Sequence, residues 1–284
     1  MTAEKYDLHC HSLASDGALS PTELVRRAHR QGVTVLALTD HDTTDGLAEA
    51  STVAGSLKLR LINGIELSAN HLNQCLHIVG LNIDPGNELL RAGIARQQML
   101  REQRAHKIAQ KLEKKGIAGA FQAVSDAADG GEITRSHFAD FLVAGGYVAD
   151  PQQAFDRYLS KGKPGYVPTQ WAALEDTVAW IRAAGGIAVL AHPLRYNLSS
   201  KWINRALTAF KLAGGQGIEV VTGRASPDDI RISQQLALQH GLYASVGSDF
   251  HSPDNQWVEL GRLAPLPANV KPIWELLPPV RSAV

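Results

Sequence analysis

Short apolar runs alternate with helical patterns along most of this chain, and that rhythm limits the fold more than any other feature. Seven runs have the length and the branched apolar content of buried strands: Tyr6–Cys10, Val33–Leu38, Leu61–Leu67, Cys75–Leu81, Gly186–Ala191, Ile218–Val221 and Tyr243–Val246. Strand alternating with helix predicts parallel, right-handed units. Seven such strands can close into a barrel, so we predict an α/β fold of the (β/α)7 TIM-like barrel type.

The helical patterns carry recognisable starts and ends. Ser20 can cap a helix that has Pro21 in its first turn, Glu23 completes a capping box, and Gly32 closes the helix. Further helices are predicted at 44–54, 174–184, 202–212 and 227–240. The tail after Arg262 holds five of the thirteen prolines, so we expect an irregular segment that wraps the barrel.

The alternation stops between the fourth and fifth strands. From Pro85 to about Pro164 no segment has a convincing strand pattern. Leu89–Lys115 has the pattern of one long polar helix, and shorter helices follow, broken by Gly130-Gly131 and Gly145-Gly146. We therefore expect a helical insertion between strands 4 and 5, with the following bounds: barrel domain 1–84 and 165–284, inserted subdomain 85–164.

Composition excludes several classes of protein. The 284 residues suit one barrel with an insertion, and 28 Lys and Arg are balanced by 28 Asp and Glu. This balance argues against a duplex DNA partner, because duplex binding needs a broad basic surface. Two cysteines, no signal-peptide core and no long apolar run predict a cytoplasmic enzyme without a membrane partner.

Histidines and carboxylates gather where the predicted strands end. In chain order they are His9, His11, Asp16, Asp40, His41, Glu66, His77, His192, Asp249 and His251. The carboxyl ends of the strands carry the active site in barrels of this kind. Six of the eleven histidines lie at these points, each in or beside an apolar run. Such joint placement indicates a shared chemical role.

Spacing supports metal binding. Residues two apart on a strand share a face, so His9 and His11 should point together, and Asp249 and His251 have the same spacing. Imidazole and carboxylate are ligands for Zn, Mn and Fe ions. Nine or ten candidates exceed the three or four that one ion needs. Two or three ions sharing carboxylates fit better, with Glu66 as the candidate bridge.

Some of these residues have simpler interpretations. His192 precedes Pro193 and could be a turn residue, and Asp16 precedes Gly17 and could be a turn carboxylate. Asp40 is expected to orient His41 rather than to bind an ion. The two cysteines, Cys10 and Cys75, are expected to be small buried side chains and not ligands.

Seven short motifs carry a family resemblance: Asp7-Leu8-His9-Cys10-His11-Ser12, Ser15-Asp16-Gly17, Leu38-Thr39-Asp40-His41-Asp42, Gly64-Ile65-Glu66, Leu76-His77-Ile78-Val79-Gly80, Ala191-His192-Pro193 and Gly247-Ser248-Asp249-Phe250-His251. In this order they resemble the PHP (polymerase and histidinol phosphatase) superfamily, over about residues 5–262. The resemblance implies a distorted (β/α)7 barrel with three divalent ions at the strand ends. Mn²⁺ is the favoured ion, with Fe²⁺ and Zn²⁺ as alternatives.

The resemblance also implies how the ligands are divided. One ion would take His9, His11, Glu66 and Asp249; a second would take Glu66, His77 and His192; the third would take Asp16, His41 and His251. Many phosphatases of the family have histidine where this chain has Asp16. That departure bears on the affinity and identity of the third ion.

Motifs in the insertion narrow the group. Ile133–His137, Tyr158–Lys163 and Tyr166-Val167-Pro168 are similar to those of 3′,5′-nucleoside bisphosphate phosphatases, whose relatives also trim short RNA from the 5′ end. The resemblance implies a substrate such as pAp, an adenosine nucleotide with phosphates on both the 3′ and the 5′ position. Removal of its 3′-phosphate yields AMP and phosphate. Three alternatives stay open: a 5′-to-3′ exoribonuclease on short RNA, a histidinol phosphate phosphatase and a non-catalytic metal-binding module.

The expected mechanism is direct attack by a metal-bound hydroxide, without a phosphoenzyme. The residues expected at the reacting atoms are Asp16, His41, Glu66, His192, Asp249 and His251. A doubly phosphorylated nucleotide needs a second anion site, for which arginine is suited because it can form two parallel hydrogen bonds to phosphate. The candidates for this site are Arg135 and His137, followed by Arg195, Lys161 and Lys163.

Overall fold

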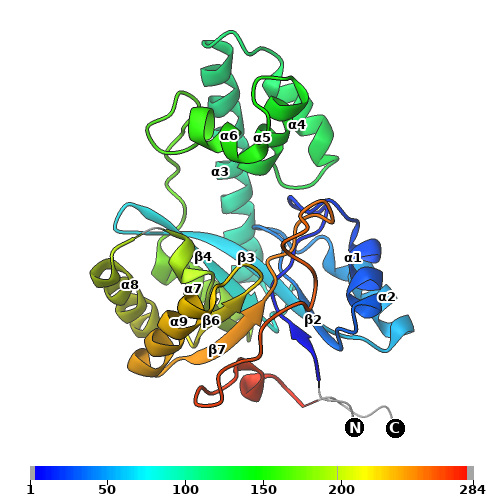
Figure 1. Ribbon diagram of the computed structural model, residues 1–284, viewed down its shortest axis with the longest axis vertical. Coiled ribbons are helices and arrows are strands. Elements are labelled where there is room, and N and C mark those ends of the chain that lie inside the picture. Colours follow the sequence, from blue (N-terminus) through cyan, green and yellow to red (C-terminus); the bar gives the residue numbers. More distant parts are fainter. Residues whose placement is uncertain (1–3, 197, 280–284) are drawn as a thin grey trace.

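Seven strands stand side by side in chain order and curve into a nearly closed barrel (Figure 1). The computed structural model describes residues 4–196 and 198–279. The strands are β1 (Tyr6–Asp7), β2 (Val35–Leu38), β3 (Arg60–His71), β4 (Gln74–Leu81), β5 (Ile187–Leu190), β6 (Gly217–Thr222) and β7 (Tyr243–Gly247). The predicted α/β class and the distorted seven-stranded TIM-like barrel are confirmed.

The first and last strands meet through irregular hydrogen bonds. The Leu8 N–H donates to the Val246 carbonyl at 3.0 Å, and the Asp249 N–H donates to the His9 carbonyl at 2.8 Å. β1 is shorter than the predicted strand because the Thr39 hydroxyl accepts the Cys10 N–H at 3.1 Å, so a side chain interrupts the ladder. The chain beyond β1 is still held in place at the end of the barrel.

The direction of β4 differs from the prediction that the strands are all parallel. β4 runs antiparallel to both β3 and β5. Leu72 (φ +48°) and Asn73 (φ +61°) make a two-residue turn in the left-handed region, which suits a hairpin, whereas a parallel crossover needs a dozen residues or more. As a result, His77 near the start of β4 lies at the same end of the barrel as the carboxyl ends of the other strands.

Helices cover the outside of the barrel, as Figure 1 shows. They are α1 (Pro21–Arg30), α2 (Leu47–Leu57), α7 (Leu174–Ala183), α8 (Ser200–Leu212) and α9 (Pro227–His240). The predicted capping box is present at α1, because the Ser20 hydroxyl accepts the Glu23 N–H and the Glu23 carboxylate accepts the Ser20 N–H. Between Arg262 and the end of the described part at residue 279, the tail is irregular except for the 3-10 helix η3 (Ile273–Leu276).

The insertion forms a helical cap above the open end of the barrel (Figure 1). Its elements are α3 (Glu88–Glu113), α4 (Ala120–Ala128), α5 (Arg135–Ala144), α6 (Pro151–Ala154) and the π-helix η1 (Phe155–Leu159). We call α4, α5, α6, η1 and the upper half of α3 the cap. Residues 85–164, all of which the structure describes, contain no strand. Their status as a separate subdomain stays a prediction, and the outer bounds at residues 1 and 284 lie outside the described part.

The long helix α3 joins the two parts. Leu90 and Ile94, near its start, belong to the barrel core, whereas Ile108 and Leu112, near its end, belong to a separate apolar core inside the cap. Its 26 residues correspond to about 39 Å. Because β4 ends at the closed floor of the barrel, α3 must cross the full height of the barrel to reach the cap. Within the described residues, no helix is both long and apolar enough to cross a membrane.

A short contiguous element, the 3-10 helix η2 (Pro193–Tyr196), follows β5 at the barrel mouth. The hydroxyl of Tyr196 donates to the Ala191 carbonyl at 3.0 Å and accepts the His77 N–H at 2.9 Å. This aromatic side chain therefore fastens β4 to the end of β5 and fixes the backbone at two predicted ligands. The Tyr196 hydroxyl thus uses its hydrogen bonds to hold the backbone in place.

Candidate functional site

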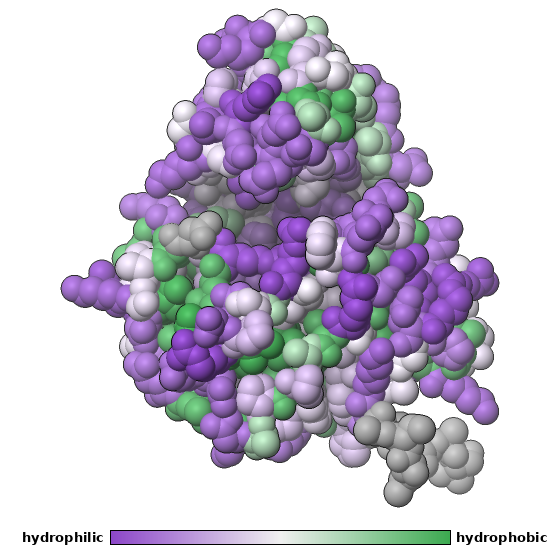
Figure 2. Space-filling view, in the orientation of Figure 1, coloured by the Kyte–Doolittle hydropathy of each residue, from purple (hydrophilic) through white to green (hydrophobic). Residues whose placement is uncertain are grey.

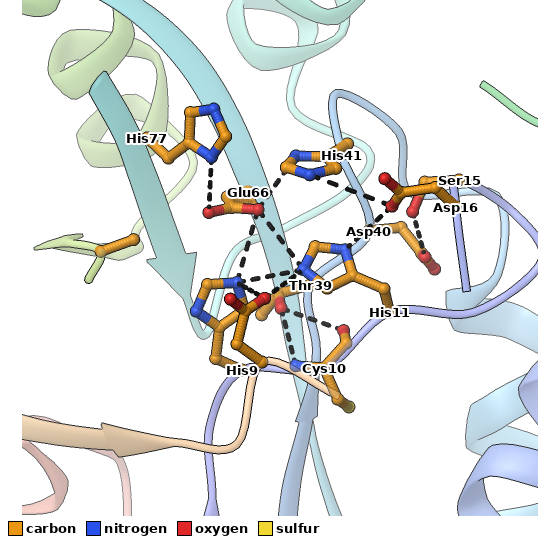
Figure 3. A network of polar contacts seen from close by, with 12 residues as sticks. His9, Cys10, His11, Ser15, Asp16, Thr39, Asp40, His41, Glu66 and His77 are labelled. Atoms are coloured by element: carbon orange, nitrogen blue, oxygen red, sulfur yellow. Dashed lines mark hydrogen bonds and ion pairs between the residues drawn. The ribbon is translucent and has the colours of Figure 1, made fainter. Parts of the chain in front are cut away.

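The structure brings all nine predicted metal ligands to one place, at the mouth of the barrel. They are His9, His11, Asp16, His41, Glu66, His77, His192, Asp249 and His251, which we call the ligand cluster. Figure 3 shows six of them, with Glu66 between His77 on one side and His11 on the other. These residues come from six strands or strand ends, so the barrel closure itself assembles them.

Glu66 lies at the centre of the cluster. Its Oε1 atom is 3.0 Å from His77 Nδ1 and 3.2 Å from His192 Nε2. Its Oε2 atom faces three more ring nitrogens, at 2.9 Å from His41 Nδ1 and 3.4 Å from both His9 Nε2 and His11 Nε2. One carboxylate therefore touches both halves of the cluster, as a bridging ligand must.

A second group surrounds one oxygen of Asp16. Asp16 Oδ1 is 3.4 Å from His251 Nε2 and 3.9 Å from both His41 Nε2 and His11 Nδ1. His11 and His41 each turn their other nitrogen towards Glu66. The rings of His11 and His41 therefore lie between Glu66 and Asp16 and belong to both groups.

Asp249 joins the cluster from the end of β7. Its Oδ1 atom is 3.3 Å from His11 Nε2 and 3.5 Å from His9 Nε2, while Arg195 donates to Oδ2. Asp249 (φ +55°) and His192 (φ +28°) both have left-handed backbone conformations, which are uncommon without glycine. Strain of this kind gathers at functional sites, where neighbouring structure holds it in place.

Charge within the cluster is strongly coupled. Burial opposes ionisation of Glu66 and Asp16, yet the imidazole of His41 holds the pKa of Glu66 well below its usual range, and that of His251 does the same for Asp16. Despite burial, the Glu66 carboxylate raises the pKa of His77 to about 10, and Asp16 raises that of His251 to about 9. The buried carboxylates thus require positive charge beside them, which bound cations would supply.

Several buried polar atoms of the cluster have no hydrogen-bond partner in the described part of the chain: His11 Nδ1, Asp16 Oδ1, His41 Nδ1, Glu66 Oε2 and His192 Nδ1. His41 Nδ1 and Glu66 Oε2 are 2.9 Å apart but lack the direction that a hydrogen bond needs. Unpaired buried atoms are costly, and metal ligation is the usual way to satisfy them. The donor set therefore fits divalent metal ions.

Three sets of side chains have ligand atoms close enough to share an ion: His11, Asp16, His41 and His251; His9, His11 and Glu66; and His41, Glu66 and His77. These sets resemble the three groups expected from the family, with three differences. His11 also joins the Asp16 group, and His41 stands where His192 was expected beside Glu66 and His77. Asp249 is absent from the set of His9, His11 and Glu66. The division of ligands among three ions stays a prediction.

Within the described chain the Asp40 carboxylate is not bonded to the His41 ring, so the expected orienting role is wrong. Its Oδ1 atom accepts the Ser12 N–H and the Ser15 hydroxyl, both at 2.7 Å, and its Oδ2 atom accepts the Ser12 hydroxyl at 2.7 Å. Figure 3 shows Asp40 beside Ser15. Asp40 therefore shapes the loop that carries Asp16.

Glu219 on β6 supports the cluster and was missing from the predicted set. Its Oε1 atom is 2.7 Å from His9 Nδ1, and its Oε2 atom accepts the His192 N–H at 2.6 Å. A carboxylate behind a ligand histidine fixes its ring, so that His9 Nε2 faces the cluster. The sequence does contain a sign of this role, because Glu219 interrupts an otherwise apolar buried strand.

The root of the cap is fastened to the barrel by buried polar residues of α3. Arg101 Nε donates to Asp42 at 2.7 Å, and Gln97 donates to the Ser68 carbonyl. Asp42 also accepts the Ser68 N–H at 2.9 Å. These contacts join α3 to the segments that carry His41 and Glu66.

A cavity of about 680 Å³ lies between the cap and the ligand cluster, and Figure 2 shows the hollow bordered mainly by hydrophilic residues. Glu66 and His251 line its floor, whereas Arg104, Arg135 and Trp171 line its upper part. The volume suits a small organic ligand such as a nucleotide.

Arg104 is the principal residue that the sequence did not single out. Its Nε atom is buried without a hydrogen-bond partner in the described residues, and its guanidinium lies 5.5 Å from the ring centre of Trp171. Burial, and then repulsion from Arg135, lowers the pKa of Arg104 to about 9. Two neighbouring cations in a partly enclosed cavity make a place for an anion.

The other predicted anion-binding residues have different positions. Arg135 lines the cavity, as does Arg195, which is bonded to Asp249. His137 does not line it, because its Nδ1 atom accepts the Thr134 N–H at 3.1 Å and caps α5. Lys161 and Lys163 are exposed and lie outside the cavity lining. The structure therefore does not bring these three residues to the lining of the cavity.

The two cysteines also differ from each other. Cys10 is buried as expected, but Cys75 is exposed and lines the cavity. The expectation that Cys75 is a buried side chain is wrong, because the hairpin that carries it projects past the barrel mouth.

Comparisons with known proteins agree with this site. The PHP domain family matches residues 7–160. A 5′-3′ exoribonuclease from Haemophilus influenzae is 47% identical over 96% of this chain and 98% of its own length. A 3′,5′-nucleoside bisphosphate phosphatase from Chromobacterium violaceum is 47% identical over 95% of each chain.

A solved structure shares the whole fold. An amidohydrolase from Chromobacterium violaceum, with bound sulfate and no metal, is 47% identical and has a TM-score of 0.91. The likeness covers 96% of this chain and 95% of the other. The family match extends over more than half of the chain and includes Glu66 and His77, and the relatives extend over nearly all of it. This chain belongs to the PHP domain family.

Proposed function

We propose that this chain is a phosphomonoesterase that needs divalent metal ions and removes the 3′-phosphate from 3′,5′-nucleoside bisphosphates. One observation carries the proposal: a single cavity has the ligand cluster at one end and the cations Arg104 and Arg135 at the other. A substrate with two separate phosphates suits a cavity with two separate anion sites.

The residues of the ligand cluster would hold the ions, with Mn²⁺ as the expected ion. Bound divalent ions would make a water molecule more acidic and neutralise charge on the phosphoryl oxygens. Glu66 would join neighbouring ions, because its two oxygens face different imidazoles. Glu219 would keep His9 turned towards them. No duplex DNA or membrane partner is proposed.

The nearby serines favour direct attack by water over a covalent enzyme intermediate. The Ser12 hydroxyl donates to Asp40 at 2.7 Å, and the Ser68 hydroxyl donates to Asp42 at 3.0 Å. Both serines are buried and hold loops in place through these bonds. A serine nucleophile needs a free hydroxyl beside a base that can accept its proton. Neither serine meets this need.

Arg104 and Arg135 would bind the 5′-phosphate. The guanidinium of Arg104 lies over Trp171, and that of Arg135 lies 5.7 Å from the ring centre of Phe155, so aromatic surfaces hold both groups. The same surfaces leave apolar area in the cavity for the nucleoside. Arg195, which is bonded to Asp249, would contact the phosphate at the ligand cluster.

The comparisons favour a second candidate function, because the Haemophilus influenzae relative and two others at 46–47% identity are 5′-3′ exoribonucleases. The 5′-phosphate of a short RNA would bind the same two arginines, and its first internal phosphate would lie at the ligand cluster. The chemistry is shared, but the leaving group would be an RNA strand.

Parallel incubation of metal-reconstituted protein with pAp and with a short 5′-phosphorylated RNA tests both functions. We expect AMP and phosphate from pAp with Mn²⁺ present, and unshortened RNA. Mononucleotides from RNA with pAp intact would support the exoribonuclease, and no release from either substrate across divalent metals would refute both. Lys161→Met, outside the cavity, is a matched control for Arg135→Met and should retain activity.

A further inference from the structure

The barrel loop that follows β1 is attached directly to the cap. The Glu132 N–H donates to the Ala14 carbonyl at 3.0 Å. Beside it, a Cβ atom added to Gly131 would lie 2.4 Å from the Leu13 carbonyl oxygen, closer than any real contact. Only glycine permits this approach, so the two loops are shaped to touch each other.

Asp16 lies in this contact and divides its two oxygens between two sets of partners. Its Oδ2 atom accepts the Thr134 hydroxyl at 2.9 Å and the Ser136 hydroxyl at 3.0 Å, both from the cap. Its Oδ1 atom is buried without a hydrogen-bond partner in the described chain and faces His251 and His41. One oxygen is bonded to the cap and the other is left for the ligand cluster.

The two hydroxyl residues stand on either side of Arg135. Thr134 is the N-cap of α5, and its hydroxyl accepts the Ser136 N–H at 3.1 Å. The arginine that lines the upper cavity is therefore held between two side chains that both bond to Asp16. The three residues 134–136 therefore join Asp16, at the lower end of the cavity, to Arg135, at its upper end.

We propose that Thr134 and Ser136 are positioning residues that couple the ligand group at Asp16 to the placement of Arg135. Binding of an ion at Asp16 and docking of the cap then stabilise each other, since coupling between two sites is reciprocal. Only the assignment of Arg135 to a substrate phosphate rests on the proposed function.

The coupling explains what a carboxylate at position 16 does that a histidine would not. An imidazole that binds an ion through one nitrogen has one other nitrogen, which carries a proton and donates. It cannot accept hydrogen bonds from two hydroxyls. Asp16 can do so and still present a free oxygen to His251.

Hydrogen exchange with and without Mn²⁺ tests the coupling without any substrate. In the unmodified chain, Mn²⁺ should slow exchange of the amides in residues 129–137, and Ser136→Ala should lose most of this response. Ser125→Ala, on α4 and outside the cavity lining, is the matched control and should respond like the unmodified chain. Exchange in residues 129–137 that is indifferent to Mn²⁺ in the unmodified chain would overturn the proposal.

Thr134 supplies an independent pair of variants. Thr134→Ser keeps the hydroxyl and should keep the Mn²⁺ response, whereas Thr134→Val should lose it. If Thr134→Val and Ser136→Ala both respond as fully as the unmodified chain, the hydroxyls do not couple the two sites.

Kinetics separate the effect of Ser136 on the ligand group at Asp16 from its effect on the placement of Arg135. Loss of one hydrogen bond to a charged group corresponds to about a tenfold change. We expect Ser136→Ala to lower kcat/KM for pAp about tenfold and to lower that for adenosine 3′-monophosphate, which lacks the distal phosphate, by clearly less. Equal losses on both substrates would contradict the link to Arg135. If the unmodified chain cleaves neither substrate, the proposed function fails while the exchange experiment still decides the coupling.

Discussion

Two arginines on α3 should respond in opposite ways to the same substitution. Arg101 and Arg104 lie three residues apart, and both guanidinium groups cover Trp171, at 5.2 and 5.5 Å from its ring centre. Arg101 is paired with the fully buried Asp42, with an NH2 to Oδ2 distance of 2.6 Å. Arg104 has a buried Nε atom without a partner in the described residues. Methionine keeps most of the apolar stem of both side chains and removes the charged guanidinium group with its hydrogen-bond donors.

The structure gives the sign and the size of each effect. Arg101→Met leaves the Asp42 carboxylate buried without its cation, which should cost about 3–5 kcal/mol. Arg104→Met removes a desolvated charge that repels Arg135, and replacing such a charge with an apolar group should stabilise the ligand-free chain by about 1–4 kcal/mol. At roughly 2–4 °C for each kcal/mol, the two melting temperatures should move apart by about 8 °C or more.

Calorimetry of metal-free protein and kinetics with pAp complete the test. Arg104→Met should melt higher than the unmodified chain yet lose about 100-fold in kcat/KM, because two hydrogen bonds to the 5′-phosphate are worth about 3 kcal/mol together. A lower melting temperature for Arg104→Met, or an unchanged kcat/KM, would refute the view that Arg104 is kept for an anionic ligand.

Two further outcomes follow from charge in the site. Removing bound metal with a chelator should lower the melting temperature, and Mn²⁺ at 100 times its dissociation constant should restore about 2.7 kcal/mol, measured by thermal unfolding; no change would contradict the fit of the ligand cluster to ions. Burial raises the pKa of Glu132 from its ordinary value of 4.5 to about 7, although Arg101 opposes the shift. The folded chain holds this proton more tightly than the unfolded chain, so the contribution of Glu132 to stability is fully present below pH 4.5 and is lost as pH rises through about 7. Glu132→Gln should remove this decline and raise the melting temperature at pH 8 but not at pH 4. Equal shifts of the melting temperature at both pH values would contradict a raised pKa of Glu132 in the folded chain.

Much of the barrel could be predicted because its determinants are local. Buried strands show as apolar runs, and ligands two residues apart, such as His9 and His11, share a face whatever surrounds them. The direction of β4 was not predicted. It depends on the backbone at Leu72 and Asn73, a turn without the glycine that usually marks such hairpins.

The upper cavity was harder to predict for a different reason. Arg104 is one of many charges on a polar helix, and its burial comes from Trp171, which lies far along the chain. The motifs indicated Arg135 and His137 as residue types but could not tell which side chain enters the cavity and which caps α5. Glu219 could have been found, since a charged residue within a buried strand needs an explanation.

The two-residue turn between β3 and β4 also governs how the cap can evolve. It sends the chain to the barrel floor, so the chain enters the cap through a single continuous helix, whose lower turns pack against Trp180 at Gly93. Each residue added to or removed from α3 above that contact would rotate everything beyond it by about 100° and shift it by about 1.5 Å. Arg104 would then leave the cavity and the Arg101 pair would break. The phase of one helix thus sets the orientation of the upper anion site, and length changes in this family member can be accommodated in the cap loops but not in α3.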